Sequence, residues 1–281
     1  MAQDNVNGVE STDIIDFIPF SQVPANKKVT YASFACDHRP LKTEPWRVRI
    51  IVGGDKLLYE SDAGSPAANM LETKILLNSV ISDAKNGARF CSMDLKDMFL
   101  HTPMLSPEYM KVHYRYFPQD IRTTYNLNDI VHSDGYIYIK IKKRMYGLKQ
   151  AAILAYEFLS KLLRQADYIP ITGALGLWKH KTRPTVLCLC VDDFGVKYYS
   201  KNDLQHLHQA ISQQYTCKID EKGNNFLGFT LDWNYDKGYV DVSMPNYVKE
   251  ALVKLQYKPK QVPQYSPHKY ISTNWTCKGN Q

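Results

Sequence analysis

Two adjacent aspartates stand between two apolar runs, and this feature most restricts what the chain can fold into. VLCLC (186–190) precedes Asp192 and Asp193, and FGVKYY (194–199) follows them. Both runs have the length and composition of buried strands, so the segment predicts a hairpin whose turn carries two carboxylates. Adjacent aspartates in an exposed turn usually serve only the turn. Beside core strands, carboxylates need partners, and a divalent cation is the natural one.

A second acidic segment lies earlier in the chain. RFCSM (89–93) predicts a short strand that runs into Asp94, and Asp97 follows three residues later. Taken alone, Asp94 is most simply the N-cap of a helix. Together with Asp192 and Asp193 it indicates a two-metal site, because Mg²⁺ prefers oxygen ligands and keeps several waters. Two such ions, about 4 Å apart, can activate a hydroxyl and stabilise a leaving group.

The remaining pattern predicts a mixed fold. GYIYIKIK (135–142) alternates strictly and is the clearest strand, whereas residues 148–164 place apolar side chains on one helical face. A further helix is expected over 65–84, with Ser65 and Pro66 at its start. The other expected elements are strands at 47–52, 109–116, 226–233 and 238–243, a helix at 203–214 with Asp203 as its N-cap, and a helix at 246–255. This interleaving predicts an α+β chain with an antiparallel sheet.

The composition narrows the function classes. The 281 residues are 44% hydrophobic and 22% charged, which is near the globular average and suffices for a sizeable core. The net charge of +7 and the 20 tyrosines suit a polyanionic partner with stacking bases, although tyrosines also serve ordinary cores. None of the six cysteines forms a CxxC pair, which argues against a structural zinc site. With no signal peptide or membrane-spanning run, we expect an intracellular protein, cytoplasmic or nuclear, without a membrane partner.

The domain organisation is expected to be simple. We expect residues 1–30 to be a loosely ordered lead-in, 31–255 to form the folded domain, and 256–281 to be a flexible tail rich in proline, lysine and polar residues.

Several motifs resemble the reverse transcriptases of copia-type retrotransposons, in the right order, over about residues 45–255. MYGLKQA (145–151) matches the YGLKQ motif of that family, and CVDD (190–193) resembles its YVDD or YMDD box. The weaker matches are to the segment of the first catalytic aspartate, the FLG hairpin and the fingers segment, at FCSMDLKDMFLHTPM (90–104), NNFLGFTL (224–231) and RVRIIVGG (47–54). YGLKQ and the Asp–Asp box together are highly specific. The resemblance implies the RNA-directed DNA polymerase domain of a Pol polyprotein, an α+β right hand with fingers, an antiparallel palm sheet and a partial thumb.

The resemblance also assigns roles to the acidic residues. Asp94, Asp192 and Asp193 are implied to be catalytic and, with the carbonyl of Leu95, to hold two Mg²⁺ or Mn²⁺ ions. The implied partners are deoxynucleoside triphosphates and an RNA or DNA template with its primer, whose 3′-hydroxyl receives the nucleotide. No acid of this set is replaced, which favours an active enzyme.

Further residues are implied to contact the nucleotide or the primer. Phe99, five residues after Asp94, stands where a steric gate excludes a 2′-hydroxyl, and it can be a core aromatic as well. Gly147 is implied to let the backbone approach the nucleotide or template. Lys218 and Lys222 are both candidates for a general acid. The implied nucleotide-binding set is Arg47, Arg49, Asp97, Phe99, Tyr146, Gly147, Lys149 and Gln150, with the last two in the first turn of a helix, and the primer grip is Phe226, Leu227 and Gly228.

Two departures and the short C-terminal part leave alternatives open. Cys190 stands where tyrosine is usual and touches the primer end, and Ala151–Ala152 replace the common Ala/Ser–Pro. The stretch after Leu255 is shorter than the about 100 residues of a ribonuclease H domain, so ribonuclease H and integrase parts are expected on a longer precursor. One alternative is a truncated relic that binds nucleic acid without extending a primer. Another is a structural or interaction module whose acids cap helices.

Overall fold

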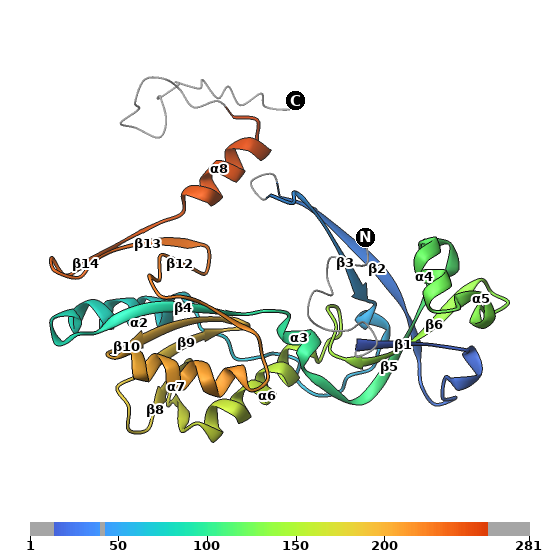
Figure 1. Cartoon of the computed structure of the whole chain (residues 1–281), viewed down its shortest axis with the longest axis horizontal. Helices are drawn as coiled ribbons and strands as arrows, with labels where there is room; N and C mark the ends of the chain where they lie inside the picture. Colours follow the sequence, from blue (N-terminus) through green and yellow to red (C-terminus); the bar gives the residue numbers. More distant parts are fainter. Residues whose placement is uncertain (1–13, 40–42, 258–281) are drawn as a thin grey trace, which may run out of the picture. The chain divides into compact units, whose positions relative to one another are not determined.

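The computed structural model describes residues 14–39 and 43–257 (Figure 1). The chain divides into two compact units, residues 1–244 and 245–281, and each is described by itself. The first unit contains three sheets with helices between their strands. The mixed α+β class with antiparallel sheets that the sequence predicts is therefore confirmed.

A five-stranded sheet contains the first three strands of the chain. Its order is β1-β6-β5-β2-β3, and every neighbouring pair is antiparallel except β2 with β5. The alternating GYIYIKIK segment lies in β6, which buries Ile137, Ile139 and Ile141. The strands are β1 (Ile15–Ile18), β2 (Val29–His38), β3 (Trp46–Val52), β5 (Pro103–His113) and β6 (Tyr136–Lys143).

The segment expected to be a loosely ordered lead-in differs in its second half. Residues 15–18 form β1, which pairs with β6 along its whole length. Ile15 and Phe17 pack against a buried cluster. The expectation rested on the polar residues at the start of the segment and missed this short apolar strand. Residues 1–13 of the lead-in, and 258–281 of the expected tail, lie outside the described residues.

A six-stranded, fully antiparallel sheet is the second sheet of the first unit. Its order is β11-β4-β10-β9-β8-β7. The predicted hairpin is present as β9 (Val186–Cys190) and β10 (Asp193–Tyr198), at the centre of the sheet. The other strands are β4 (Arg89–Leu95), β7 (Tyr168–Ile171), β8 (Ala174–His180) and β11 (Cys217–Asp220).

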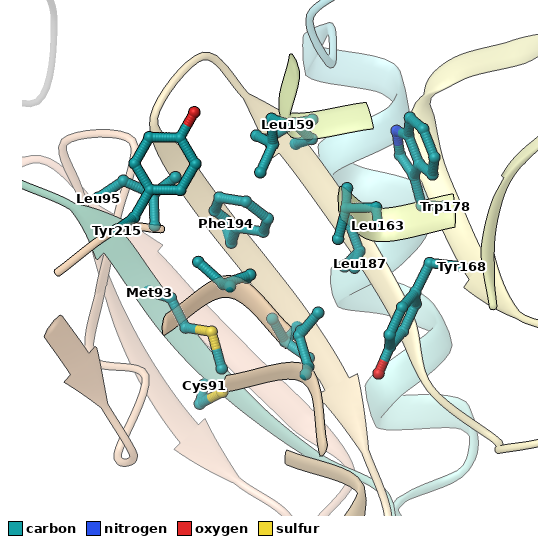
Figure 2. Close-up of a cluster of buried hydrophobic side chains, with 14 of the residues drawn as sticks. Cys91, Met93, Leu95, Leu159, Leu163, Tyr168, Trp178, Leu187, Phe194 and Tyr215 are labelled. Carbon is teal, nitrogen blue, oxygen red and sulfur yellow. The ribbon is translucent and has the colours of Figure 1, made fainter. Parts of the chain in front are cut away.

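Helices α6 (Ala151–Gln165) and α7 (Lys201–Ser212) cover one face of this sheet (Figure 1). Leu159 and Leu163 of α6 meet Leu187 and Phe194 of the central strands in one buried cluster (Figure 2). Each such side chain, fully buried, contributes about 1.5–3 kcal/mol relative to exposure. This packing fixes both strands of the hairpin and therefore the position of its turn.

Helix α2 (Met70–Ser82) packs on the opposite face, where Leu76 and Val80 join a cluster with residues of β4 and β9. It begins later than the sequence predicts. Asn69 Oδ1 accepts a hydrogen bond from the Glu72 amide at 2.9 Å, and Glu72 Oε2 accepts one from the Asn69 amide at 2.8 Å. This reciprocal capping box satisfies two free amides at once and so outcompetes the Ser65–Pro66 start.

Two further helix starts also differ from the prediction. Gln150 is the N-cap of α6, so Lys149 and Gln150 precede the helix instead of lying in its first turn. The reason is Gly147, whose φ of 96° keeps the preceding segment out of the helix. In α7, Ser200 is the N-cap and accepts a hydrogen bond from the Asp203 amide, so Asp203 lies inside the first turn.

The remaining elements are short. A three-stranded sheet has the order β12-β13-β14, with β12 (Asn225–Phe226), β13 (Phe229–Asn234) and β14 (Tyr239–Ser243). The short helices of the first unit are α3 (Met98–His101), α4 (Gln119–Thr124), α5 (Leu127–Ile130), η1 (Phe20–Gln22), η2 (Gly54–Lys56), η3 (Ala84–Asn86) and η4 (Tyr114–Tyr116). The second unit contains α8 (Pro245–Lys254), close to the predicted 246–255. Among the described residues, no helix combines the length and the apolar character needed to cross a membrane.

Candidate active site

The strand register brings the two acidic segments together at one end of the six-stranded sheet. Asp193, the first residue of β10, pairs with Asp94 of β4. Asp192 lies in the preceding turn, and its carbonyl accepts a hydrogen bond from the Leu95 amide at 3.0 Å. Val191 closes the turn with a φ of 60°, which is rare for a β-branched residue. The structure thus brings Asp94 next to Asp192 and Asp193, although it is far from them in the sequence.

The surroundings of these aspartates disfavour their negative charges. The pKa of Asp193 is raised to about 6, first by burial and then by the charges of Asp192 and Asp94. Burial also raises the pKa of Asp192, and the charge of Asp94 adds to the shift whereas that of Arg49 opposes it. Like charges that are close and partly withdrawn from water are stabilised by a cation between them.

The donor set suits Mg²⁺ in its chemistry. Three carboxylates and the Leu95 carbonyl offer the hard oxygen ligands that this ion prefers. In the part of the chain that the structure describes, no three acidic, histidine or cysteine side chains converge closely enough to enclose an ion as they stand. Ligation would therefore require the side chains of Asp94, Asp192 and Asp193 to turn toward a common point.

A row of four residues crosses the sheet at this end. Lys218 of β11 pairs with Asp94, Asp94 pairs with Asp193, and Asp193 pairs with Cys190. Cross-strand partners lie on the same face of a sheet, so the register places Lys218 directly beside the carboxylates. Lys222, the other candidate for a general acid, lies in the loop after β11. Burial raises the pKa of the Cys190 thiol, and the neighbouring aspartates raise it further, so this thiol stays protonated near neutral pH.

Arginines of β3 lie near the acidic residues. Arg47 and Arg49 are two residues apart on β3 and therefore point to the same face. The Arg49 guanidinium lies 5.1 Å from the centre of the Tyr146 ring. Its charge acts to lower the pKa of Asp192. Burial lowers the pKa of Arg47, and the charges of Arg49 and Arg39 lower it further. Positive charge is thus concentrated next to the acidic end of the sheet.

Asp97 and Phe99 lie just beyond β4. Asp97 precedes α3 with a φ of 53°. Its charge acts to raise the pKa of both Arg47 and Tyr146. The ring of Phe99 meets that of Tyr146 edge to face, with the centroids 5.2 Å apart. Phe99 also contacts both large buried clusters while remaining partly exposed. It is therefore at least a core aromatic, and part of the residue remains exposed.

The turn before α6 is shaped by contact with β3. The Val52 amide donates to the Tyr146 carbonyl at 2.8 Å, and a Cβ atom at Gly147 would lie 2.1 Å from the Val52 carbonyl oxygen. Gly147 is thus required by the close approach of β3, where the sequence suggested the approach of a ligand. Lys149 Nζ donates to the Leu57 carbonyl at 3.2 Å.

The FLG segment forms a tight hairpin turn between β12 and β13. Leu227 and Gly228 have φ values of 50° and 80°, as a two-residue turn of this kind requires. This turn interrupts the single strand predicted over 226–233. Phe226 is buried and packs on Phe90 with the ring centroids 5.7 Å apart. Of the three residues that the resemblance implies to be a primer grip, Phe226 therefore serves the core, and Leu227 and Gly228 lie at the tip.

The structure gathers part of the predicted site and adds to it. The acids, Leu95, Arg47, Arg49, Asp97, Phe99 and Tyr146 form one neighbourhood, whereas Phe226, Leu227 and Gly228 belong to a separate hairpin. Sequence reasoning missed Arg39, whose charge reaches Arg47. Arg39 directly follows β2, and only the pairing of β2 with β3 brings it near Arg47, so no local pattern in the sequence marked it.

The sequence is similar to Gag-Pol polyproteins of transposons from Saccharomyces cerevisiae. It is 30% identical to the transposon Ty1-BR Gag-Pol polyprotein over 126 residues, which cover 42% of this chain and 7% of the polyprotein. It is 23% identical to the transposon Ty1-BL Gag-Pol polyprotein over 218 residues, which cover 74% of this chain and 11% of the polyprotein. The chain thus spans about a tenth or less of the length of these relatives. No protein-family model matches the chain. The similarity supports a retrotransposon-derived protein.

Among solved structures, the chain is similar to apo telomerase from Candida tropicalis truncated from its C-terminal domain. The sequence identity is 14%, the TM-score is 0.43, and the match covers 86% of this chain and 59% of that chain. A TM-score this low does not establish a shared fold.

Proposed function

We propose that this chain is the polymerase part of a retrotransposon reverse transcriptase, an RNA-directed DNA polymerase that extends a primer with deoxynucleotides. The observation that carries the proposal is the pairing of Asp193 with Asp94, with Asp192 in the adjoining turn. Nucleotidyl transfer needs acidic ligands for cations next to positive groups for a triphosphate. Arg47 and Arg49 supply such positive groups nearby. The similarity to Ty1 Gag-Pol polyproteins supports the same class of protein.

The three sheets take the parts of a right hand in this proposal. The six-stranded antiparallel sheet is the palm, because it carries the carboxylates at one end. The five-stranded sheet is the fingers, because β3 presents its arginines toward that end. The β12–β13 turn, with Leu227 and Gly228 at its tip, is the primer grip. The second unit would begin a thumb.

The acidic end would hold the divalent cations. Asp94, Asp192 and Asp193, with the Leu95 carbonyl, would ligate Mg²⁺ or Mn²⁺. When bound, these ions supply activation of the primer 3′-hydroxyl and neutralise charge on the phosphates. The backbone hydrogen bond from Leu95 to Asp192 keeps the turn against β4, so the backbone that carries the carboxylates is fixed and only their side chains would have to turn.

Groups around the carboxylates would position and select the nucleotide. Arg47 and Arg49 would bind the triphosphate, with Arg49 held in place by the face of Tyr146. The partly exposed Phe99 would exclude a 2′-hydroxyl, so that deoxynucleotides are preferred. Lys218, which pairs with Asp94, would donate a proton to the leaving pyrophosphate. The template and primer would be RNA or DNA, and ribonuclease H and integrase would belong to a longer precursor.

Primer extension tests the proposal. The purified chain would be given an oligo-dT-primed RNA template, deoxynucleotides and Mg²⁺ or Mn²⁺, beside Asp192→Asn and the exposed-site control Asp236→Asn. We expect extension by the parent and by Asp236→Asn and none by Asp192→Asn. Extension by all three alike would refute the role of the hairpin carboxylates.

A second candidate function is nucleic-acid binding without extension, by a relic of such an element. The observation that favours it is that the acidic side chains do not converge on an ion as they stand. In the same assay, this candidate predicts that the folded parent and Asp192→Asn bind the primer–template alike and that neither extends it.

A further inference from the structure

A basic cavity lies at the end of the β9–β10 hairpin opposite to the carboxylates. Its volume is about 200 Å³, and its lining includes Lys179, Arg183, Lys197 and Tyr199 but no acidic residue. Lys197 is the fourth residue after Asp193 in β10, a distance of about 13 Å along an extended strand. The cavity is therefore distinct from the candidate active site.

The strand register creates the positive charge. Lys179 of β8 pairs with Val186 of β9, and Val186 pairs with Lys197 of β10. Residues that pair across strands lie on the same face, so the two lysines flank one valine there. Lys179 is exposed and makes no ion pair with any side chain in the described ranges.

Lys197 is held rigidly within the fold. Its side chain is only 8% exposed, and Nζ donates to the Ser79 carbonyl at 2.9 Å and to Asp83 Oδ2 at 2.5 Å. The Tyr199 hydroxyl donates to the same Asp83 oxygen at 2.8 Å. These bonds use two of the three hydrogens of the ammonium group and leave one for a ligand.

The β8–β9 turn adds a second fixed cation. Arg183 Nη1 donates to Asp203 Oδ1 at 3.0 Å, and the Arg183 amide donates to His180 Nδ1 at 2.9 Å. Burial lowers the pKa of His180, so this ring is neutral near pH 7 and contributes no charge. Since Asp83 and Asp203 balance Lys197 and Arg183, the net charge of the cavity comes from Lys179.

We propose that this cavity binds a phosphate group through Lys179, Arg183 and Lys197. The cavity lining offers three cationic donors. A phosphate group suits them because its oxygens can accept several charge-assisted hydrogen bonds at once. Two of these donors are fixed by their own carboxylates, so little side-chain entropy is lost when the anion binds. The proposal does not depend on polymerase activity, because it can be measured on the resting chain.

Calorimetric titration with inorganic phosphate tests this site. Lys179→Glu is compared with Lys161→Glu, a matched charge reversal at an exposed position of α6. We expect the parent and Lys161→Glu to bind phosphate alike and Lys179→Glu to bind it at least about tenfold more weakly. Circular dichroism confirms that each variant is folded. Absence of phosphate binding by the folded parent, or equal binding by both variants, would overturn the proposal.

A second measurement identifies the source of the phosphate. The affinity for a primer–template is measured against salt concentration for the parent and Lys179→Gln. If the cavity binds the backbone of a nucleic acid, the variant should lose about one unit of the logarithmic salt slope. If the slope is unchanged while inorganic phosphate binding is lost, the ligand is a small phosphate compound.

Discussion

The two ends of the β9–β10 hairpin carry opposite charges and differ in how those charges are balanced. At the turn, the pKa values of Asp192 and Asp193 are raised, because burial and the neighbouring carboxylates disfavour their ionised forms. At the other end, Lys197 is bound by Asp83 and the Ser79 carbonyl. The buried Lys197 thus has its partners within the fold, whereas the acids at the turn, and Lys179 at the basic end, depend on something that binds. A charge left uncompensated by its own protein is the better indicator of a site.

The difference between the two ends disappears if the aspartates at the turn have only a structural role. We expect Asp193→Ala to lower the rate of primer extension by about 1,000-fold, because removal of a cation ligand costs several kcal/mol of transition-state stabilisation. Single-turnover extension measures this effect. Asp236→Ala, at an exposed turn, should retain the parent rate, and an unchanged rate in Asp193→Ala would exclude a catalytic role.

The strand that joins the two ends should be stabilised by packing and not by charge. Phe194, in the middle of β10, is fully buried in the cluster of Figure 2. We expect Phe194→Ala to lower the free energy of unfolding by about 3–5 kcal/mol through the cavity that it leaves. Urea denaturation measures it, and Leu105→Ala, at a side chain that is 99% exposed, should cost less than about 0.5 kcal/mol. Equal effects would mean that β10 is not held by this cluster.

Phe99 tests whether the acidic end of the sheet selects nucleotides. Its ring contacts Tyr146, and the residue is only partly buried. We expect Phe99→Ala to raise the use of ribonucleotides relative to deoxynucleotides by about tenfold or more, with little loss of deoxynucleotide incorporation. Competition between matched nucleotide pairs measures the ratio. If the variant unfolds instead, the ring serves only the core and the gate assignment falls.

At the basic end we expect the smallest effect, which is a dependence of the free energy of unfolding on pH. Bonds from Lys197 and Tyr199 lower the pKa of Asp83 below its ordinary value of 3.8. A lowered pKa means that the carboxylate stabilises the fold above about pH 4 and that this contribution is lost as the pH falls toward the lowered pKa. Asp83→Asn should therefore be less stable than the parent at pH 7, and the difference should shrink at pH 3. Denaturation curves at both pH values test this, and a constant difference would contradict it.

The sequence predicted the elements whose pattern is local. The apolar runs on either side of Asp192 and Asp193 predicted β9 and β10, and the alternation of 135–142 predicted β6, because burial of a strand face leaves a period of two in the sequence. The start of α2 was wrong, since Ser65–Pro66 and Asn69–Glu72 are both plausible starts and only the reciprocal hydrogen bonds decide between them.

Features that depend on register could not be predicted from local pattern. No sequence rule places Lys218 beside Asp94, or Lys179 in one row with Lys197, because the order of strands in a sheet depends on tertiary packing. Gly147 was noticed as a glycine that allows close approach, but its partner proved to be the backbone of Val52. Phe226 looked functional by resemblance, and the structure shows it buried against Phe90.

Binding of Mn²⁺ tests most directly whether the acidic end of the sheet is a cation site. The electron paramagnetic resonance signal of free Mn²⁺ is followed as the ion is added to the parent, to Asp94→Asn and to the control Asp236→Asn. The parent and the control should reduce the free signal equally, and Asp94→Asn should bind the ion at least about tenfold more weakly. Equal binding by all three proteins, or none by the folded parent, would contradict the account.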